Sequence, residues 1–332
     1  MNYSGGKIMS KKYDVVALGE LLIDFTDSGV SEQNNSVFEA NPGGAPCNVL
    51  AMLKKLGKEC AFIGKIGNDI FGRILTDVVK EVGISTEGLV VDSYYNTTLA
   101  IVKTYENGER DFSFYRHPGA DMMLKADEVN LELIRSAKIF HFGTLSMTDP
   151  EVREATKKAI ACAKEEGLIV SFDPNYRAPL WNSEEDAKEQ IAYGLSVCDV
   201  VKISDNEIEM MTGIADFDQS AAQLLQQYPN ITLLNLTAGR DGSYAFYKDK
   251  KVYRGITHND GVIEKTGAGD TFCGSMLNFV LEHGLADMTE KDLGDMLTFA
   301  NTAAYLVTTK KGAIRSMPEK SKIEELIREI KE

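Results

Sequence analysis

Short apolar runs alternate with amphipathic stretches along most of the chain. Runs rich in Val, Ile and Leu predict buried strands. They are CAFIGKIG (60–67), KIFHFG (138–143), LIVSFD (168–173), VVKIS (200–204) and ITLLNLT (231–237). Apolar residues at helical spacing predict helices at 48–56, 73–83, 152–167, 220–228, 271–283, 292–307 and 320–332. This alternation indicates an α/β fold: an open, mostly parallel central sheet with helices on both faces.

The first apolar run, YDVVALGELLIDF, extends from Tyr13 to Phe25 and is broken at Gly19 and Glu20. Its composition predicts a buried first strand that leads into a loop. Asp24 would then sit just past the end of that strand.

A hairpin signal interrupts the alternation near residue 97. The segments TLAIVKTY (98–105) and DFSFY (111–115) flank Asn107 and Gly108, which tolerate the positive φ of a tight turn. We interpret about 97–117, with the polar stretch at about 29–41, as a small β lid that stands off the main sheet. The sequence thus predicts a flexible tail over 1–12 and a single domain over 13–332.

The net charge limits what the protein can bind. Of 332 residues, 43% are hydrophobic and 26% are charged, as in ordinary globular proteins, and the formal net charge is −14. A field of this sign repels polyanions, so neither nucleic acid nor an anionic membrane is expected as a partner. Phosphate would have to bind in a local pocket of backbone N–H groups and a few cations.

The cysteines and the N-terminus favour a cytoplasmic protein. Five scattered cysteines without a C-x-x-C pair indicate neither a disulfide framework nor a zinc site. The segment MNYSGGKIMSKK is polar, unlike a secretory signal, and no segment approaches the ~18 uninterrupted apolar residues of a membrane span. We therefore expect a cytoplasmic enzyme without a membrane partner.

The string TGAGD, from Thr266 to Asp270, precedes a predicted helix. Gly267 and Gly269 would let backbone N–H groups approach an anion at the helix N-terminus. A glycine turn with Asp270 as N-cap would explain the string equally well. A carboxylate beside an anion site suits a kinase, because the acid can accept the proton of an attacking hydroxyl. A Walker A string and the protein-kinase motifs are absent, and the dinucleotide-binding fingerprint is incomplete.

Two motifs on opposite halves of the chain resemble one known family. GGAPCNVLAMLKKLG (43–57), followed by FIGKIGNDIFG (62–72), is similar to the first signature of the ribokinase-like (PfkB) carbohydrate kinases, and EKTGAGDTFCGS (264–275) is similar to the second. Matches between these motifs extend the resemblance from Tyr13 to Pro318. It implies a ribokinase-like fold and the transfer of the γ-phosphoryl group of ATP to a sugar hydroxyl.

The resemblance assigns a role to each motif residue. Asp270 would be the catalytic base, and the backbone of Gly267, Ala268 and Gly269 would form the anion hole. The residues implied at the sugar site are Asp24, in GELLIDF, together with Gly43, Gly44 and Asn48. The residues implied near the nucleotide are Thr237, Gly239 and Gly242, in LNLTAGRDGS, and Asn301, in FANTAA.

A metal-organising acid is implied in VKISDNEIEMMTG (201–213). The family has an N-x-x-E stretch here, whose acid helps to organise Mg²⁺ through water, and Glu207 aligns with that acid although Ser204 replaces the Asn. Asn206 and Glu209 have the same spacing and allow a second register. The second signature also departs from the family, because Glu264 and Lys265 stand in place of the usual Asp and Thr. A monovalent cation near this loop is therefore left open.

Two further strings bear on the choice of sugar. FDPNYRAPLW (172–181) and FYRHPGADMML (114–124) resemble fructokinases, and Arg177 and Arg116 could bind sugar oxygens. Fructose is therefore favoured. A 2-keto-3-deoxygluconate kinase, in which Arg177 would pair with the substrate carboxylate, and a non-catalytic sugar sensor are the alternatives. Because an exposed lid has unpaired strand edges, two lids are expected to pair in a homodimer.

Overall fold

The computed structural model describes residues 11–104, 110–256, 258 and 260–331, and it contains two sheets. The larger sheet has nine strands in the order β13-β12-β11-β10-β9-β8-β1-β4-β5. Its strands are β1 (Tyr13–Leu18), β4 (Cys60–Gly67), β5 (Ser85–Asp92), β8 (Ala137–Gly143), β9 (Ile169–Asp173), β10 (Val200–Ser204), β11 (Leu233–Thr237), β12 (Ser243–Tyr247) and β13 (Lys250–Arg254). Among the described strand pairs of this sheet, only β11 with β12 and β12 with β13 are antiparallel, so the predicted mostly parallel sheet is confirmed.

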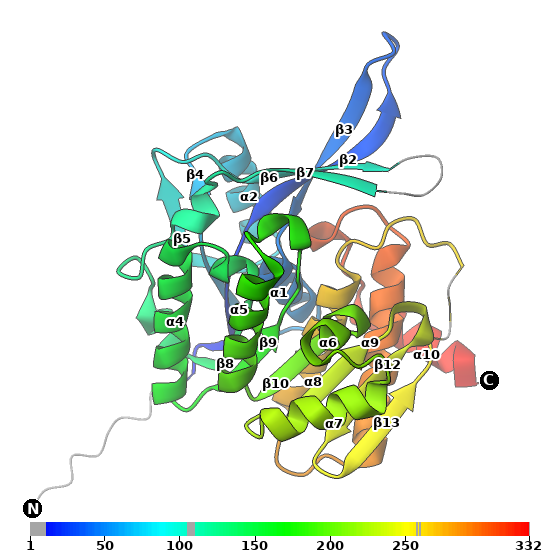
Figure 1. Cartoon of the computed structure of the whole chain (residues 1–332). Coiled ribbons are helices and arrows are strands. Elements are labelled where there is room, and N and C mark those ends of the chain that lie inside the picture. The colour runs from blue at the N-terminus through cyan, green and yellow to red at the C-terminus, as the bar shows by residue number, and fades with distance from the viewer. Residues whose placement is uncertain (1–10, 105–109, 257, 259, 332) are drawn as a thin grey trace, which may run out of the picture.

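Helices cover both faces of this sheet (Figure 1). Successive residues of β1 point to opposite faces, so Val15 and Ala17 belong to one hydrophobic core and Val16 and Leu18 to the other. The first core packs against α1 (Ala45–Lys55), α2 (Ile70–Glu81), α8 (Ala268–His283), α9 (Glu290–Thr308) and α10 (Lys320–Lys331). The second packs against α3 (Leu131–Arg135), α4 (Pro150–Glu165), α5 (Glu184–Val197), α6 (Asp205–Thr212) and α7 (Phe217–Gln227). Within the described residues, no helix combines the length and apolarity needed to cross a membrane.

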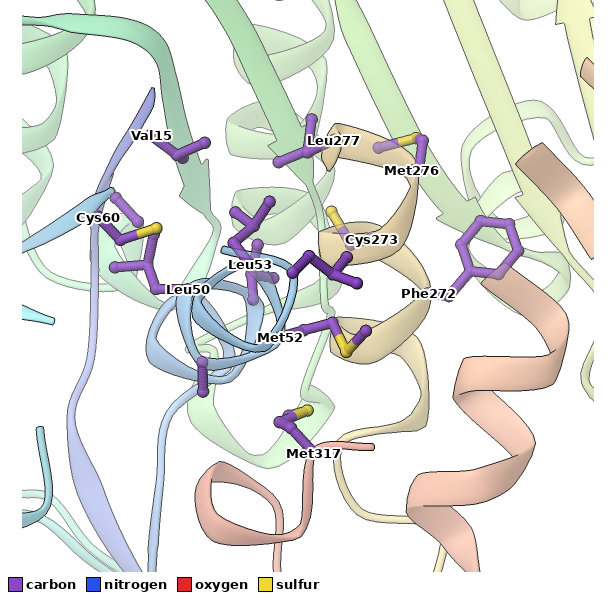
Figure 2. Close-up of a cluster of buried hydrophobic side chains, with 14 of the residues drawn as sticks. Val15, Leu50, Met52, Leu53, Cys60, Phe272, Cys273, Met276, Leu277 and Met317 are labelled. Carbon is purple, nitrogen blue, oxygen red and sulfur yellow. The ribbon is translucent and has the colours of Figure 1, made fainter. Parts of the chain in front are cut away.

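Helices α1 and α8 cross closely in the first core, where Leu53 and Cys273 lie at their contact (Figure 2). Gly274 makes this close approach possible. A Cβ at Gly274 would lie 2.8 Å from both the Cβ of Met52 and the carbonyl oxygen of Val49. The missing side chain therefore brings the N-terminal half of α1 against the first turns of α8.

The smaller sheet, here called the lid, stands off the main sheet (Figure 1). Its strands are β2 (Leu22–Val30), β3 (Ser36–Gly43), β6 (Leu99–Thr104) and β7 (Arg110–Tyr115), in the order β3-β2-β6-β7. The lid thus begins earlier than the predicted residue 29. The predicted Asn107–Gly108 turn lies outside the described residues, as do residues 1–10 of the predicted tail.

The prediction that the first strand leads into a loop, with Asp24 just past its end, is wrong about Asp24. The chain leaves β1 after Leu18 and enters the lid as β2 at Leu22, so Asp24 lies inside a lid strand instead of past the end of a core strand. The break falls at Gly19 and Glu20. The Glu20 carboxylate accepts a hydrogen bond from the backbone N–H of Ala45 at 2.6 Å, so the break between the sheets is tied to the start of α1.

Candidate active site

Two cavities meet at the N-terminus of α8. The lid cavity, of about 500 Å³, lies between the lid and the carboxyl ends of the main-sheet strands. The side cavity, of about 230 Å³, lies between β11, α8 and α9. Lys265 and Gly269 line both cavities, so the second signature motif separates them.

The lid contributes one wall of the lid cavity. Alternate residues of β2 line it, as strand geometry requires, and they are joined by residues of β6 and β7. These lid residues are Leu22, Asp24, Thr26, Ala100, Val102 and Phe114. The opposite wall comes from α1, α8 and the ends of β9 and β10, and it includes Gly44, Asn48, Arg177, Glu207, Gly267 and Asp270.

Asp24 is partly buried and lines this cavity although it lies on the lid. Burial raises the pKa of its carboxyl to about 7, and Glu264 and Asp270 act in the same direction while Arg177 opposes them. Gly43 pairs with Leu22 across the β2–β3 register and so lies diagonally from Asp24, and a Cβ there would collide with the Asp24 carboxylate. Gly43 therefore acts by leaving room for Asp24.

Asp270 and Asn48 meet on the opposite wall. The Asn48 Nδ2 donates a hydrogen bond to Asp270 Oδ2 at 2.7 Å, and both side chains are buried. Burial raises the pKa of Asp270, whereas the Asn48 hydrogen bond and the charges of Lys202 and Arg177 lower it. The close crossing of α1 and α8 therefore places a carboxyl with a raised pKa at the cavity surface.

The first turn of α8 has the features of an anion site. Its N-cap, Gly267, has φ 78°, a left-handed conformation that favours glycine. The first N–H groups of a helix have no intrahelical acceptor, and those of Gly269 and Asp270 belong to this turn. The Ala268 N–H already donates to the Lys265 carbonyl at 3.3 Å. Gly269 lines both cavities, so its N–H lies where an anion could bind at the boundary between them.

Glu207 lies on the wall of the lid cavity, whereas Asn206 and Glu209 are exposed and line neither cavity. Its carboxylate accepts hydrogen bonds from the backbone N–H groups of Ser204 and Tyr176, both at 2.8 Å. Ser204 completes a capping box at the start of α6. Of the two possible alignments with the family's N-x-x-E stretch, the geometry thus favours the one in which Glu207 is the acid.

No motif in the sequence assigned a role to Lys202, which lines this site, or to Asp173, its ion-pair partner. Lys202 lies on β10 and lines the lid cavity, and its Nζ is 3.2 Å from both carboxylate oxygens of Asp173 at the end of β9. Although burial lowers the pKa of Lys202, Asp173, Glu207 and Asp270 raise it above its usual range. The sequence feature that could have indicated a functional Lys202 is its place inside the otherwise apolar run VVKIS (200–204).

The side cavity contains the residues that the motifs place near a nucleotide. Its lining includes Thr237, Gly239, Gly242, Ala268 and Asn301. The Asn301 side chain accepts a hydrogen bond from Ser243 at 2.9 Å and donates one to the Arg254 carbonyl at 3.0 Å. Asn301 therefore fixes the ends of β12 and β13 at the rim of the cavity.

The two arginines proposed for the sugar occupy different places. Arg177 is exposed and lines the lid cavity, following Asn175, which has φ 45°. Arg116 is buried outside the cavity lining, where it pairs with Asp121 at 2.8 Å and donates to Thr148 and the Leu145 carbonyl. In this structure Arg116 fastens the base of the lid to the main body.

Comparison with known proteins identifies the family. Residues 12–320 match the pfkB family of carbohydrate kinases. The chain belongs to that family. It is 44% identical over 306 residues to probable fructokinase-2 of Arabidopsis thaliana, covering 92% of each protein. It is 40% identical over 317 residues to fructokinase-1 of Zea mays, covering 94% of this chain and 97% of the relative. The resemblance drawn from the two motifs is confirmed.

Solved structures of pfkB-family kinases superpose over nearly the whole chain. Fructokinase with bound ATP from Xylella fastidiosa gives a TM-score of 0.87 at 32% identity and covers 96% of this chain and 99% of that chain. A Vibrio cholerae fructokinase with bound fructose, ADP and calcium gives 0.82 at 27% identity, covering 94% and 98%. The ribokinase-like fold is therefore shown for this pfkB-family kinase.

Proposed function

We propose that this protein is an ATP-dependent fructokinase that phosphorylates a primary hydroxyl of fructose. One observation carries the proposal: the cavity lined by Asp24 and Asp270 meets the cavity lined by Thr237 and Asn301 at Gly269. A sugar in the first and a nucleotide in the second would place acceptor and donor on either side of the α8 N-terminus. The fructokinase relatives support fructose as the acceptor and ATP as the donor.

In this proposal Asp270 accepts the proton of the attacking hydroxyl. Its pKa is raised by burial, which brings it closer to neutrality and suits a general base. Asn48 holds the carboxylate by its hydrogen bond at 2.7 Å, and Asp24 on the lid accepts hydrogen bonds from other sugar hydroxyls. The N–H of Gly269 and the α8 dipole stabilise negative charge on the transferred phosphoryl group.

Magnesium would neutralise charge on the nucleotide phosphates and orient them. Within the described residues, no group of three or more His, Cys, Asp or Glu side chains could cage a metal. Mg²⁺ commonly keeps several waters and binds through one or two carboxylates plus the phosphates, so this arrangement fits it. Both Glu207 oxygens hold backbone N–H groups, which suits a contact through water.

The family's monovalent cation is not carried over to this chain. The Glu264 carboxylate accepts hydrogen bonds from Thr266 at 2.5 Å and from the backbone N–H of Gly312 at 3.1 Å. The neighbouring Lys265 is exposed and brings a permanent positive charge to the boundary between the cavities. The residues at this position therefore do not favour an added cation.

A 2-keto-3-deoxygluconate kinase is the second candidate, because the Arg177 guanidinium could pair with a substrate carboxylate in the lid cavity. ADP release should be measured with fructose, ribose, 2-keto-3-deoxygluconate and adenosine under one set of conditions. We expect fructose to give the highest kcat/KM by a wide margin. A preference for the acid sugar would move the protein to the acid-sugar kinases, and no turnover with any of them would favour a sugar sensor.

Pairing of two lids in a homodimer is also proposed. β3 and β7 are the outer strands of the lid, and Val30, Val37 and Tyr115 are exposed on it. Sedimentation at micromolar concentration should show a dimer, and a monomer would refute this part. We further propose the cytoplasm as the compartment, where its five buried free thiols would stay reduced.

A further inference from the structure

Lys202 is a buried cation against the first turn of α8. The residue is 6% exposed, and Asp173 holds its Nζ at 3.2 Å. On its other side, the Nζ lies 3.1 Å from the point that a Cβ on Gly269 would occupy. The ammonium group therefore lies beside the backbone that precedes Asp270.

Several titratable groups face this ammonium. The carboxylates of Asp173, Glu207 and Asp270 approach it from β9, α6 and α8, and the thiol of Cys273 and the imidazole of His141 lie within its electrostatic reach. Glu207 has both oxygens on backbone N–H groups, and Asp173 Oδ1 also accepts from the N–H of Asn175. Of the three cations on the described walls of the lid cavity, Lys202 is the buried one, because Arg177 and Lys265 are exposed.

We propose that Lys202 is a positioning residue that keeps the Asp270 carboxylate ionised, by fixing a positive charge beside the first turn of α8. A cation near a buried carboxylate favours its charged form. The negative charge of an arriving phosphoryl group would have the opposite effect on Asp270, because it favours the protonated form of that carboxyl. The ion pair with Asp173 offsets the free-energy cost of removing the Lys202 ammonium from water. This inference rests on the proposed role of Asp270 as the base.

The direction of the expected pH effect follows from the need for an ionised base. Activity is lost as the pH falls through the pKa of Asp270, which produces an acid limb in the profile of kcat at saturating fructose, where the effect of Asp24 on KM does not enter. Burial raises that pKa, and Lys202 is one of three groups that lower it. Without the ammonium the pKa rises further, so the acid limb should move to higher pH.

The test is the pH profile of kcat at saturating fructose in Lys202→Met, which introduces a neutral side chain of similar length. We expect the acid limb to move up by about 1–3 pH units, the range typical of a nearby opposite charge. At pH values below the limb of the parent, activity should fall by about tenfold for each pH unit that the limb moves, and it should recover as the pH is raised. Lys202→Arg retains the charge and should keep the limb close to that of the parent. An unmoved limb in Lys202→Met would overturn the proposal.

Lys65 provides a matched control. It is 3% exposed and pairs with Asp92 at 3.1 Å and Glu128 at 2.7 Å, but it lines neither cavity. Lys65→Met should lower Tm, because it removes the ion pairs of a buried ammonium with two partly buried carboxylates, without moving the acid limb. A limb that moved equally in both variants would show a general loss of integrity and would refute a specific role for Lys202.

A further variant keeps the test valid if Lys202→Met does not fold. Lys202→Met combined with Asp173→Asn removes both charges of the buried pair, and its limb is compared with that of Asp173→Asn alone. A higher limb in the double variant supports the proposal, and coincident limbs overturn it. Asp270→Asn separates the two levels of inference: if it is inactive while Lys202→Met keeps the parent limb, the proposed base stands and only the role of Lys202 fails.

Discussion

The lid cavity and the side cavity are built from different parts of the chain. Ionisable side chains line the lid cavity, and they include Asp24, Lys202 and Asp270. Two turn glycines, Gly239 and Gly242, and an amide whose hydrogen bonds go to the protein line the side cavity. The side cavity also has ionisable side chains in its lining, among them Arg240 and Lys265, but its two turn glycines set the path of the backbone. We expect side-chain charge to determine function in the lid cavity and the backbone path to determine it in the side cavity. Substitutions should therefore change the rate of reaction in the first and nucleotide affinity and stability in the second.

The largest effect is expected for Asp270→Asn, which keeps the shape of the lid cavity and removes the proton acceptor. The kcat should fall by ~100 to 10,000-fold, the usual contribution of a general base, with little change in sugar affinity. Steady-state kinetics and fructose binding by calorimetry measure the two quantities. Near-normal kcat in Asp270→Asn, with activity abolished in Asp24→Asn, would place the base on the lid instead.

Gly269→Val tests the wall that the two cavities share. Its Cβ would lie 3.1 Å from the Lys202 Nζ, and the branched methyl groups would crowd the N–H assigned to the phosphoryl group. The backbone of Gly269 is not in the left-handed region, so the substitution should destabilise the protein through crowding alone. We expect the free energy of unfolding to fall by about 1–3 kcal/mol. We expect the KM values of ATP and fructose to rise together and Tm to fall. A change in only one KM would contradict a shared wall.

Asp24→Asn should act mainly on sugar binding. Losing hydrogen bonds to a charged group costs about 1.5–3 kcal/mol, so the KM for fructose should rise roughly 10 to 100-fold, with a smaller change in kcat. The pKa of Asp24 is about 7, so the carboxyl is protonated below that pH and ionised above it. In the parent the KM for fructose should fall as the pH rises through 7. Loss of this dependence in Asp24→Asn would support the assignment, and its persistence would contradict it.

The smallest effect is expected for a pair of glycines in the side cavity. Gly242 has φ 89°, and a Cβ there would collide with the Arg254 carbonyl. Gly239 has φ 53° but open space around it. Gly242→Ala should therefore lower Tm and raise the KM for ATP clearly more than Gly239→Ala, which carries only the left-handed cost of about 1–2 kcal/mol. Equal losses in Tm and KM would show that the contact with Arg254 is unimportant.

Local patterns were sufficient to predict much of this molecule. Apolar runs located β4 and β8 to β11, and the paired signatures led to Asn48 and Asp270 because each lies within its own motif. The sequence did not indicate that these two side chains touch. That contact depends on the crossing of α1 and α8, which the missing side chain of Gly274 permits.

Other features depended on tertiary context that local patterns do not contain. Asp24 was misplaced because the apolar run through Leu22 continues unchanged from a core strand into a lid strand. Arg116 was grouped with Arg177 because both are cations near fructokinase-like strings, but Asp121 binds Arg116 away from the cavity. The antiparallel pair β12 and β13 was not predicted, because the only feature interpreted in that region was the glycine turn in LNLTAGRDGS that precedes the pair.

The hydrogen bond between Asn48 and Asp270 joins residues 222 positions apart. A ribosome that adds about 5–20 residues per second needs roughly 11–44 seconds to synthesise that interval. A growing chain could therefore form β1 to β4 and the lid well before it acquires the helix that carries the base. For the part of that interval after β7 has been synthesised, a nascent chain would present half of a sugar site without the means to turn a substrate over.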